Sequence, residues 1–484
     1  MQTMDRIETR CLIGGASVDA IGGHRFDVRN PATDEVVASV AKAGGADANA
    51  AVAAAAGALP SWRATPAGDR ARLLHELSRL MNRDQERLAR LMTLEQGKPL
   101  VEARGEISYA TSFLDWAAEE GRRLEGEIIP ASSSDKRILV LRMPVGVTAA
   151  ITPWNFPTAM ITRKLGPALA AGCTMVVKPA EETPLSALAV GALAIEAGIP
   201  NGVVNILAGD PPSIGDELLG NPAVRKLSFT GSTGVGKLLM RKAAENVTRL
   251  SLELGGHAPF IVFDDADVSA AVAGAVATKF RNAGQTCICA NRFFVQAGVY
   301  DEFVARLDAE VASMQVGNGL DEAVSIGPLI NDAAVEKVEQ HVEDARAGGA
   351  TVRTGGARVT IDGLSPRFYA PTILEGFTSE MLVNREETFG PVAPVRSFRD
   401  ETEVIEWANN SPFGLAAYFY TRDASRLMRV AEALEYGIIG ANDGAPSTAQ
   451  APFGGMKQSG FGREGGKHVM HEYVDVKYVS WGLR

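Results

Sequence analysis

The apolar positions of the chain repeat with two different periods, which predict helices in some segments and strands in others. Residues 46–58 (ADANAAVAAAAGA) are rich in alanine and predict a helix. Leucines recur at helical spacing through residues 67–95, with arginines between them, and predict one long amphipathic helix. The leucines of its apolar stripe are Leu73, Leu74, Leu77, Leu80, Leu88 and Leu91.

From residue 146 onward, short apolar runs alternate with helical patterns. The runs 146–154, 168–180, 202–209 and 224–232 each contain a predicted strand, and the second begins with a helix end and a glycine cap. This alternation predicts parallel sheet in a doubly wound nucleotide-binding arrangement. A second series begins near residue 256 with a strand (APFIVF), a helix (DVSAAVAGAVATKF) and another strand (RFFVQ).

Two segments belong to neither series. Residues 122–144 and 474–483 are apolar and β-rich, as are strands that pair with another subunit. We therefore expect a homodimer or a homotetramer.

Composition and charge narrow the class of protein. A chain of 484 residues needs two or three domains, and 46% hydrophobic with 22% charged residues is typical of a soluble globular protein. The net charge of −10, without any basic block, argues against nucleic acid as a partner. No apolar stretch resembles a signal peptide or a membrane span. The four cysteines form neither a disulfide framework nor a zinc-binding pattern, so we expect a cytoplasmic protein without a metal.

Cys287 lies in FRNAGQTCICANR (280–292), where a glycine and a glutamine precede it at a predicted turn. A reactive thiol needs such an exposed turn, with backbone N–H groups or positive charge to stabilise the thiolate. The alternative is a small buried hydrophobic residue, which is the usual role of a free cysteine. The segment alone leaves both interpretations open.

Two further side chains are candidates for catalysis, one as a base and one as a hydrogen-bond donor to an oxyanion. Glu253 ends an alternating strand before two glycines (LSLELGG), where partial desolvation would raise its pKa and suit it to act as a base. The alternative is a solvent-facing carboxylate. Asn155 lies between two prolines in PWNFP (153–157), where its amide could stabilise an oxyanion or form only a structural Asx turn.

The segment FTGSTGVGK (229–237) places a glycine-rich turn before a predicted helix, and such a turn suits a pyrophosphate. Gly231, Gly236 and Lys237 match part of an ATPase phosphate loop, but Leu238 stands where a magnesium-binding hydroxyl is needed. The segment thus indicates a nucleotide weakly and argues against an ATPase.

Taken together, these segments resemble the aldehyde dehydrogenase family. PWNFP, KPAE, FTGS, LELGG, GQTC, ETFGPV and PFGG occur in the family's order over nearly the whole chain. The resemblance implies an α/β fold with a Rossmann-like cofactor-binding domain (1–121 and 145–255), an α/β catalytic domain (256–455) and a small β oligomerisation arm (122–144 and 470–484).

The resemblance also implies the catalytic roles. Cys287 attacks the aldehyde, and Asn155 with the Cys287 backbone N–H holds the oxyanion. Glu253 activates the water that hydrolyses the resulting thioester, and Glu464 supports proton relay. The positions that it assigns to the cofactor site are Trp154, Lys178, Glu181, Gly231, Ser232, Glu387 and Phe389.

Glu181 favours NAD over NADP, because a carboxylate accepts from ribose hydroxyls but repels a 2′-phosphate. Lys178 acts in the opposite direction, so we expect a preference for NAD and not an exclusion of NADP.

Three segments are similar to succinate-semialdehyde dehydrogenases, which implies that Arg163, Arg281 and Ser447 bind the substrate carboxylate. Guanidinium groups suit a carboxylate well. Glutarate semialdehyde and neutral aliphatic or aromatic aldehydes are the alternative substrates. Cys289 follows the nucleophile by two residues, and our hypothesis is that it forms a reversible, strained disulfide with Cys287; an inert neighbour is the alternative.

Overall fold

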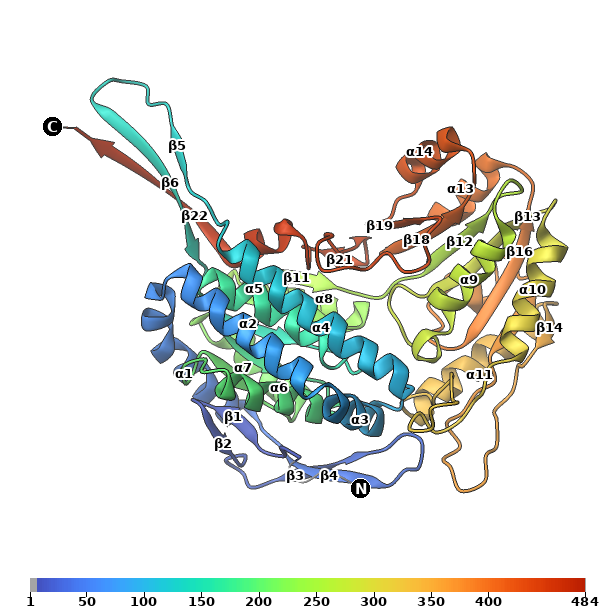
Figure 1. Ribbon diagram of the computed structural model, residues 1–484, viewed down its shortest axis with the longest axis horizontal. Coiled ribbons are helices and arrows are strands. Elements are labelled where there is room, and N and C mark those ends of the chain that lie inside the picture. Colours follow the sequence, from blue (N-terminus) through green and yellow to red (C-terminus); the bar gives the residue numbers. More distant parts are fainter. Residues whose placement is uncertain (1–6, 484) are drawn as a thin grey trace.

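In the computed structural model, which describes residues 7–483, two α/β lobes lie side by side and a β arm projects from the first (Figure 1). The first sheet has the order β2-β1-β9-β8-β7-β10-β11-β21, and its strands from β9 to β11 are parallel. Their order matches that of dinucleotide-binding sheets, as the alternating pattern predicted. The strands are β1 (Cys11–Ile13), β2 (Ala16–Val18), β7 (Val147–Ile151), β8 (Thr174–Lys178), β9 (Val204–Ile206), β10 (Val224–Thr230), β11 (Arg249–Glu253) and β21 (Gly460–Phe461).

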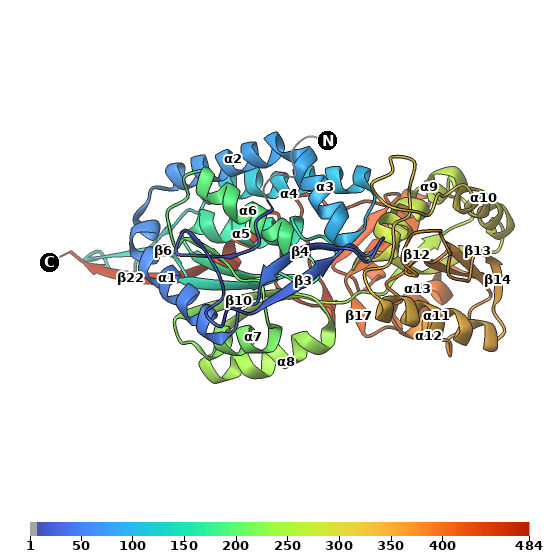
Figure 2. The same cartoon turned by 90° about the horizontal axis from the view of Figure 1, so that it is seen from below.

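Helices lie on both sides of this sheet, with α7 and α8 on one side and α2, α4, α5 and α6 on the other (Figure 2). The β8 strand is buried along its whole length, as expected for a strand covered on both faces. The helices of this lobe are α1 (Gly45–Ala64), α2 (Ala67–Arg83), α3 (Gln85–Gln96), α4 (Leu100–Gly121), α5 (Ala159–Ala171), α6 (Pro184–Glu196), α7 (Pro211–Gly220) and α8 (Thr233–Ala243), with the short 3-10 helix η1 (Ala244–Asn246).

The prediction of a single helix over 67–95 is wrong, because the chain breaks at Asp84 into α2 and α3. Asp84 leaves helical geometry at ψ 14°, and its carboxylate pairs with Arg83 at 2.7 Å and with Arg87 at 2.8 Å. Aspartate prefers such end positions to helix interiors. Both helices pack on α4, so apolar residues keep their helical spacing on either side of Asp84. The spacing of leucines therefore could not show that the helix ends there.

The second lobe is built on a seven-stranded sheet of order β14-β15-β16-β13-β12-β18-β19, parallel except for β14. Its strands are β12 (Ala258–Val262), β13 (Ala290–Gln296), β14 (Thr351–Thr354), β15 (Thr372–Glu375), β16 (Val392–Phe398), β18 (Ala416–Tyr420) and β19 (Ile438–Ala441). Its helices are α9 (Val268–Lys279), η2 (Arg281–Gly284), α10 (Tyr300–Ala312), α11 (Asp332–Ala347), α12 (Leu382–Arg385), α13 (Glu401–Asn409) and α14 (Ala424–Ala433).

The two β-rich segments that fitted neither series form one antiparallel sheet, which confirms that they are strands. It consists of β5 (Glu127–Ile129), β6 (Lys136–Pro144) and β22 (Val474–Gly482), which follows the 3-10 helix η3 (Lys467–Tyr473). Two small ribbons complete the fold: β3 (Arg25–Arg29) with β4 (Val36–Ala41), and β17 (Phe413–Gly414) with β20 (Met456–Lys457). Among residues 7–483, no helix is long and apolar enough to cross a membrane.

Candidate active site

The carboxyl ends of the parallel strands in the first lobe face the loop that carries Cys287 in the second lobe. A cavity of about 360 Å³ lies between them. The position agrees with the general location of ligand sites in open α/β sheets. Eight of the residues that the sequence indicated line this cavity: Trp154, Asn155, Gly231, Ser232, Glu253, Cys287, Glu387 and Phe389.

Cys287 lies in a tight loop between α9 and β13, and its thiol is partly exposed to the cavity. Two non-glycine residues before it, Asn282 and Ala283, have left-handed backbone conformations (φ 52° and 53°). Such conformations persist only where the surrounding structure enforces them. Gly256 permits the loop to approach, because a Cβ there would lie 2.4 Å from the Cys287 carbonyl oxygen. Desolvation raises the pKa of Cys287 to about 12, which favours the thiol over the thiolate.

Asn155 follows β7 and is 2% exposed. Its Nδ2 donates to the backbone oxygen of Gln285 at 3.0 Å, which ties the side chain to residues 280–289, the loop that carries the candidate nucleophile Cys287 and is called the nucleophile loop below. An amide nitrogen carries two hydrogens, so one remains available to a second acceptor. This arrangement suits an oxyanion donor better than an isolated Asx turn.

Glu253 is the last residue of β11 and is 3% exposed, which excludes the solvent-facing alternative. Neither carboxyl oxygen has a hydrogen-bond partner in the protein. Burial, together with the nearby charge of Glu464, raises its pKa well above the usual range. A buried carboxyl group that lines the cavity and lacks partners is suited to accept a proton.

Glu464 is also buried, but cations surround it. Its carboxylate contacts Lys164 and lies 2.8 Å from Nε of Arg163. Burial acts to raise its pKa, but Lys164 and Arg163 outweigh burial and hold the pKa below the usual range. The pKa values of Glu253 and Glu464 thus shift in opposite directions, as expected for one group that exchanges a proton and one that remains ionised.

The three residues expected to bind a substrate carboxylate come together with Cys287. Arg163, Arg281 and Ser447 line one small cavity with Cys287, although they come from different parts of the chain. Arg163 is fully buried over the ring of Phe453 at 3.8 Å, and its Nη2 has no partner. Arg281 is exposed, and a larger adjoining cavity of about 250 Å³ is lined by both Arg281 and Ser447.

Two of the expected cofactor residues lie outside the cavity with Cys287. Lys178 ends β8 and its Nζ lies 2.6 Å from the Glu181 carboxylate, so the two side chains neutralise each other. The sequence did not indicate two lysines of this region. Lys337 of α11 lines the cavity from the side of the second lobe, and Lys164 of α5 pairs with Glu464. Lys337 lies on an ordinary amphipathic helix, and no motif marks it.

Cys289 is buried, and both it and Cys287 are free thiols in this structure. Its Sγ lies 3.3 Å from Nζ of Lys279 and also contacts the Lys279 carbonyl oxygen. A disulfide with Cys287 would require the Cys289 side chain to leave these contacts, and it remains a prediction.

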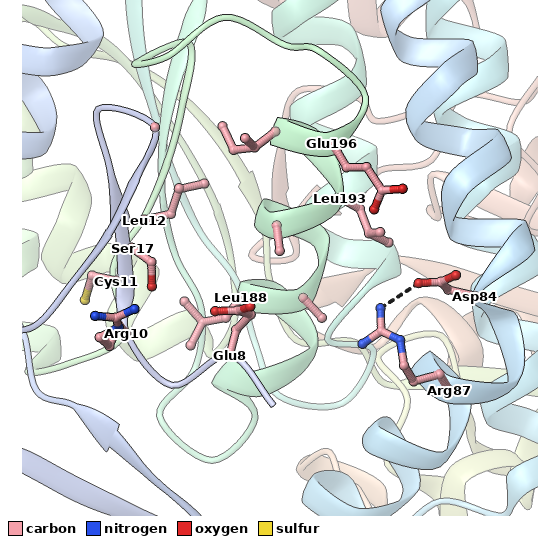
Figure 3. A pocket seen from close by; sticks show the side chains of 14 residues that line it. Glu8, Arg10, Cys11, Leu12, Ser17, Asp84, Arg87, Leu188, Leu193 and Glu196 are labelled. Atoms are coloured by element: carbon pink, nitrogen blue, oxygen red, sulfur yellow. Dashed lines mark hydrogen bonds and ion pairs between the residues drawn. The ribbon is translucent and has the colours of Figure 1, made fainter. Parts of the chain in front are cut away.

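A larger cavity of about 540 Å³ lies away from these residues, between β1, β2, α3 and α6 (Figure 3). Its charged side chains include Asp84 and Arg87, which pair with each other, and Glu196, which pairs with Arg83 at 2.5 Å. None of the site residues indicated by the sequence lines it. The size of a cavity therefore does not locate the chemistry in this fold.

Comparisons with known proteins agree with this geometry. The model of the "Aldehyde dehydrogenase family" matches residues 18–479. The chain is 56% identical over 474 residues to a succinate-semialdehyde dehydrogenase [NADP(+)] of Escherichia coli, covering 98% of each chain. It is 56% identical over 473 residues to a glutarate-semialdehyde dehydrogenase of Pseudomonas aeruginosa, covering 98% of this chain and 97% of the relative.

A solved structure of succinate-semialdehyde dehydrogenase from Burkholderia pseudomallei superposes with a TM-score of 0.98 at 52% identity, covering 100% of this chain and 99% of that one. Family, sequence and fold therefore agree over almost the full length. The chain belongs to the aldehyde dehydrogenase family.

Proposed function

We propose that this protein oxidises succinate semialdehyde to succinate with NAD(P), through a thioester on Cys287. The observation that carries the proposal is one cavity shared by a thiol, an amide donor and a carboxyl group without partners: Cys287, Asn155 and Glu253. Glutarate semialdehyde is the second candidate substrate. The glutarate-semialdehyde dehydrogenase of P. aeruginosa and the succinate-semialdehyde dehydrogenase of E. coli are both 56% identical to the chain.

The first step is attack of the Cys287 sulfur on the aldehyde carbon. The thiol must lose its proton, and the deprotonated carboxylate of Glu253 is the acceptor within the cavity. The C=O bond opens as the S–C bond forms, and the negative charge develops on oxygen. The free Asn155 amide hydrogen and the Cys287 backbone N–H hold that charge.

The residues around the cavity fit a nicotinamide dinucleotide. Ser232 caps α8, whose amino end carries a partial positive charge and faces the cavity, and Gly234 of its first turn borders open space. Trp154 and Phe389 contact each other edge to face at 5.6 Å and line the same space. When bound, the dinucleotide supplies the hydride acceptor that turns the thiohemiacetal into a thioester.

Hydrolysis of the thioester requires a base for water. Glu253 first releases to solvent the proton that it took from the Cys287 thiol. Its carboxylate then takes a proton from water, hydroxide adds to the thioester carbon, and the C–S bond breaks to release the acid and the Cys287 thiolate. The proton on Glu253 can then return to that thiolate. Glu464 stays ionised beside Lys164 and influences Glu253 through its charge.

The substrate's far carboxylate would lie between Arg163 and Arg281, with Ser447 as a third donor. The buried guanidinium of Arg163, with its unpartnered Nη2, and the exposed one of Arg281, which lines both cavities, provide charge-assisted bonds. Cofactor reduction should therefore be compared for succinate semialdehyde, glutarate semialdehyde and hexanal. Fast turnover of a semialdehyde acid alone supports the proposal, and equal turnover of hexanal contradicts the assignment of the substrate.

For the cofactor we propose a preference for NAD over NADP. The Glu181 side chain is 44% exposed at the end of β8, and its pairing cancels the charge that Lys178 would offer a 2′-phosphate. The E. coli relative is named as an NADP(+) enzyme, so the two cofactors must be compared directly. We expect Glu181→Gln to raise the kcat/KM ratio of NADP to NAD by roughly tenfold, about 1.4 kcal/mol. An unchanged ratio would contradict the role of Glu181.

A further inference from the structure

The sequence EQGKP (95–99) has no part in the chemistry above, yet it buries a charged residue completely. The side chains of Lys98 and Glu106 form an ion pair at 2.5 Å and are 0% and 1% exposed. Burying two charges costs several kcal/mol per ion, on the order of what their attraction returns, and an apolar pair is often equally stable. Stability alone is therefore a poor explanation for this pair.

Both members of the pair hold the segment that carries Asn155. Lys98 Nζ donates to the Asn155 backbone oxygen at 2.7 Å. The second oxygen of Glu106 accepts from the backbone N–H groups of Thr158 at 2.9 Å and Ala159 at 3.1 Å, at the start of α5. One ion pair therefore fixes both ends of residues 155–159.

The same region is tied to the nucleophile loop. The Lys98 backbone N–H donates to Gln96 Oε1, and Gln96 Nε2 donates to Asn282 Oδ1, both at 3.0 Å. Asn282 Nδ2 donates in turn to the Asn155 backbone oxygen at 3.0 Å. The Asn155 carbonyl thus accepts from a lysine and from a residue of the loop that leads to Cys287.

We propose that the Lys98–Glu106 ion pair is a positioning unit for the oxyanion-binding amide of Asn155. The proposal rests on the function proposed above, in which that amide stabilises the charge that develops on the aldehyde oxygen. The pair fixes the backbone of Asn155, and the bond to Gln285 fixes its side chain. A displacement of about 1 Å at such a donor can reduce the rate roughly a hundredfold.

The test is the double variant Lys98→Met with Glu106→Gln. It removes both charges together, so no lone buried charge remains, and glutamine keeps an acceptor oxygen for the helix amides. We expect kcat for the aldehyde to fall by about tenfold or more while the KM for aldehyde and for cofactor stays within about twofold. Alkylation of Cys287 by iodoacetamide should keep its wild-type rate, because that reaction develops no oxyanion.

Glu95→Gln is the matched control. Glu95 is a fully buried carboxyl group that accepts from the backbone N–H groups of Leu185 and Ser186 at the start of α6, as Glu106 does for α5. Its substitution should leave kcat unchanged. An equal loss of kcat in this control would mean that any buried helix cap gives the effect, and would overturn the proposal.

A double-mutant cycle with Asn155→Ala distinguishes failure of the positioning role from failure of the oxyanion role. If the pair acts through the Asn155 side chain, the double variant should cause no further loss of kcat in the Asn155→Ala background. Unchanged kcat in the double variant, a loss that adds to that of Asn155→Ala, or equally slowed alkylation would overturn the positioning role. Full activity of Asn155→Ala itself would instead refute the oxyanion role, and this proposal with it. If the double variant does not fold, Glu106→Gln alone enters the same cycle.

Discussion

At the scale of single residues, two buried carboxyl groups close to each other have opposite properties. Glu253 has no partner and a raised pKa, whereas Glu464 contacts two cations and has a lowered one. The difference follows from neighbours and not from residue type. We therefore propose that Glu253 transfers protons and that Glu464 supplies a fixed negative charge.

This difference predicts how activity depends on pH. A base acts only when deprotonated, and the pKa of Glu253 is raised, so hydrolysis of the thioester should slow as pH falls through that raised value. A glutamate with an ordinary pKa of about 4.3 would leave the rate flat near neutral pH. The dependence of kcat on pH tests this prediction under conditions in which hydrolysis of the thioester limits the steady-state rate. A profile whose acid limb lies at the ordinary glutamate pKa would contradict the role of Glu253.

The two arginines of the substrate site should respond differently to substitution. Arg281 is exposed beside the Phe156 ring, so Arg281→Ala should lower kcat/KM for succinate semialdehyde roughly tenfold to a hundredfold, the loss of one charge-assisted bond, and spare hexanal. Arg163 also pairs with Glu464, so Arg163→Ala should slow both substrates. Equal losses on both aldehydes for Arg281→Ala would contradict the carboxylate site.

At the scale of elements, the site depends on how closely the nucleophile loop approaches the end of β11. Gly255 and Gly256 follow that strand, and a Cβ on either would meet Glu387 or Cys287. The paired glycines after Glu253 therefore reflect contact between the two lobes.

Gly256→Ala should therefore disable the enzyme. The new Cβ would lie 2.4 Å from the Cys287 carbonyl oxygen, which forces the loop to move, and we expect kcat to fall about a hundredfold. Gly215→Ala in α7 is the matched control, because open space surrounds that position and activity should be unchanged. Near wild-type activity of Gly256→Ala would show that the approach is not required.

The sequence predicted most elements of the fold, but not all their limits. The strands around Cys287 and Glu253 follow from apolar runs, and the glycine-rich turn before α8 follows from its composition. The break at Asp84 could not be predicted, because the leucines of α2 and of α3 have the same helical spacing and both helices pack on α4.

The candidate site was predicted where a motif marks it. Cys287, Asn155 and Glu253 lie in such motifs and do line one cavity. Lys98 was missed, because its role depends on contacts with Glu106 and Asn155, and Lys337 was missed, because no motif marks its place at the cavity. A local sequence pattern does not predict contacts between segments that are far apart in the chain.

At the scale of the whole molecule, the site lies between two lobes whose apolar cores are packed separately, and a third sheet projects away from both (Figure 1). The domain boundaries expected from the sequence remain predictions. The arm exposes large apolar side chains, including Ile128 (78%), Val476 (62%) and Trp481 (58%). Such a surface is typical of a subunit interface, and we propose a homo-oligomer built through the arm.

The arm gives a direct prediction about assembly. Val476→Glu and Trp481→Glu place charges at positions exposed in the single chain, so folding should be preserved while an apolar interface is weakened. Light scattering after size exclusion should show a smaller oligomer than wild type. Met428→Glu on α14, 57% exposed, is the control and should not change the mass. A monomeric wild type would contradict the assembly proposed for the arm.

The central claim is that oxidation proceeds through a thioester on Cys287 that Glu253 helps to hydrolyse. The most direct measurement is mass spectrometry of Glu253→Gln after mixing with NAD and succinate semialdehyde at alkaline pH, where solvent can take the thiol proton in place of Glu253, and quenching in acid. We predict a succinyl group on the peptide that contains Cys287, formed in step with reduced cofactor and absent from Cys287→Ala. Reduced cofactor without this adduct, or the adduct on another residue, would contradict the account.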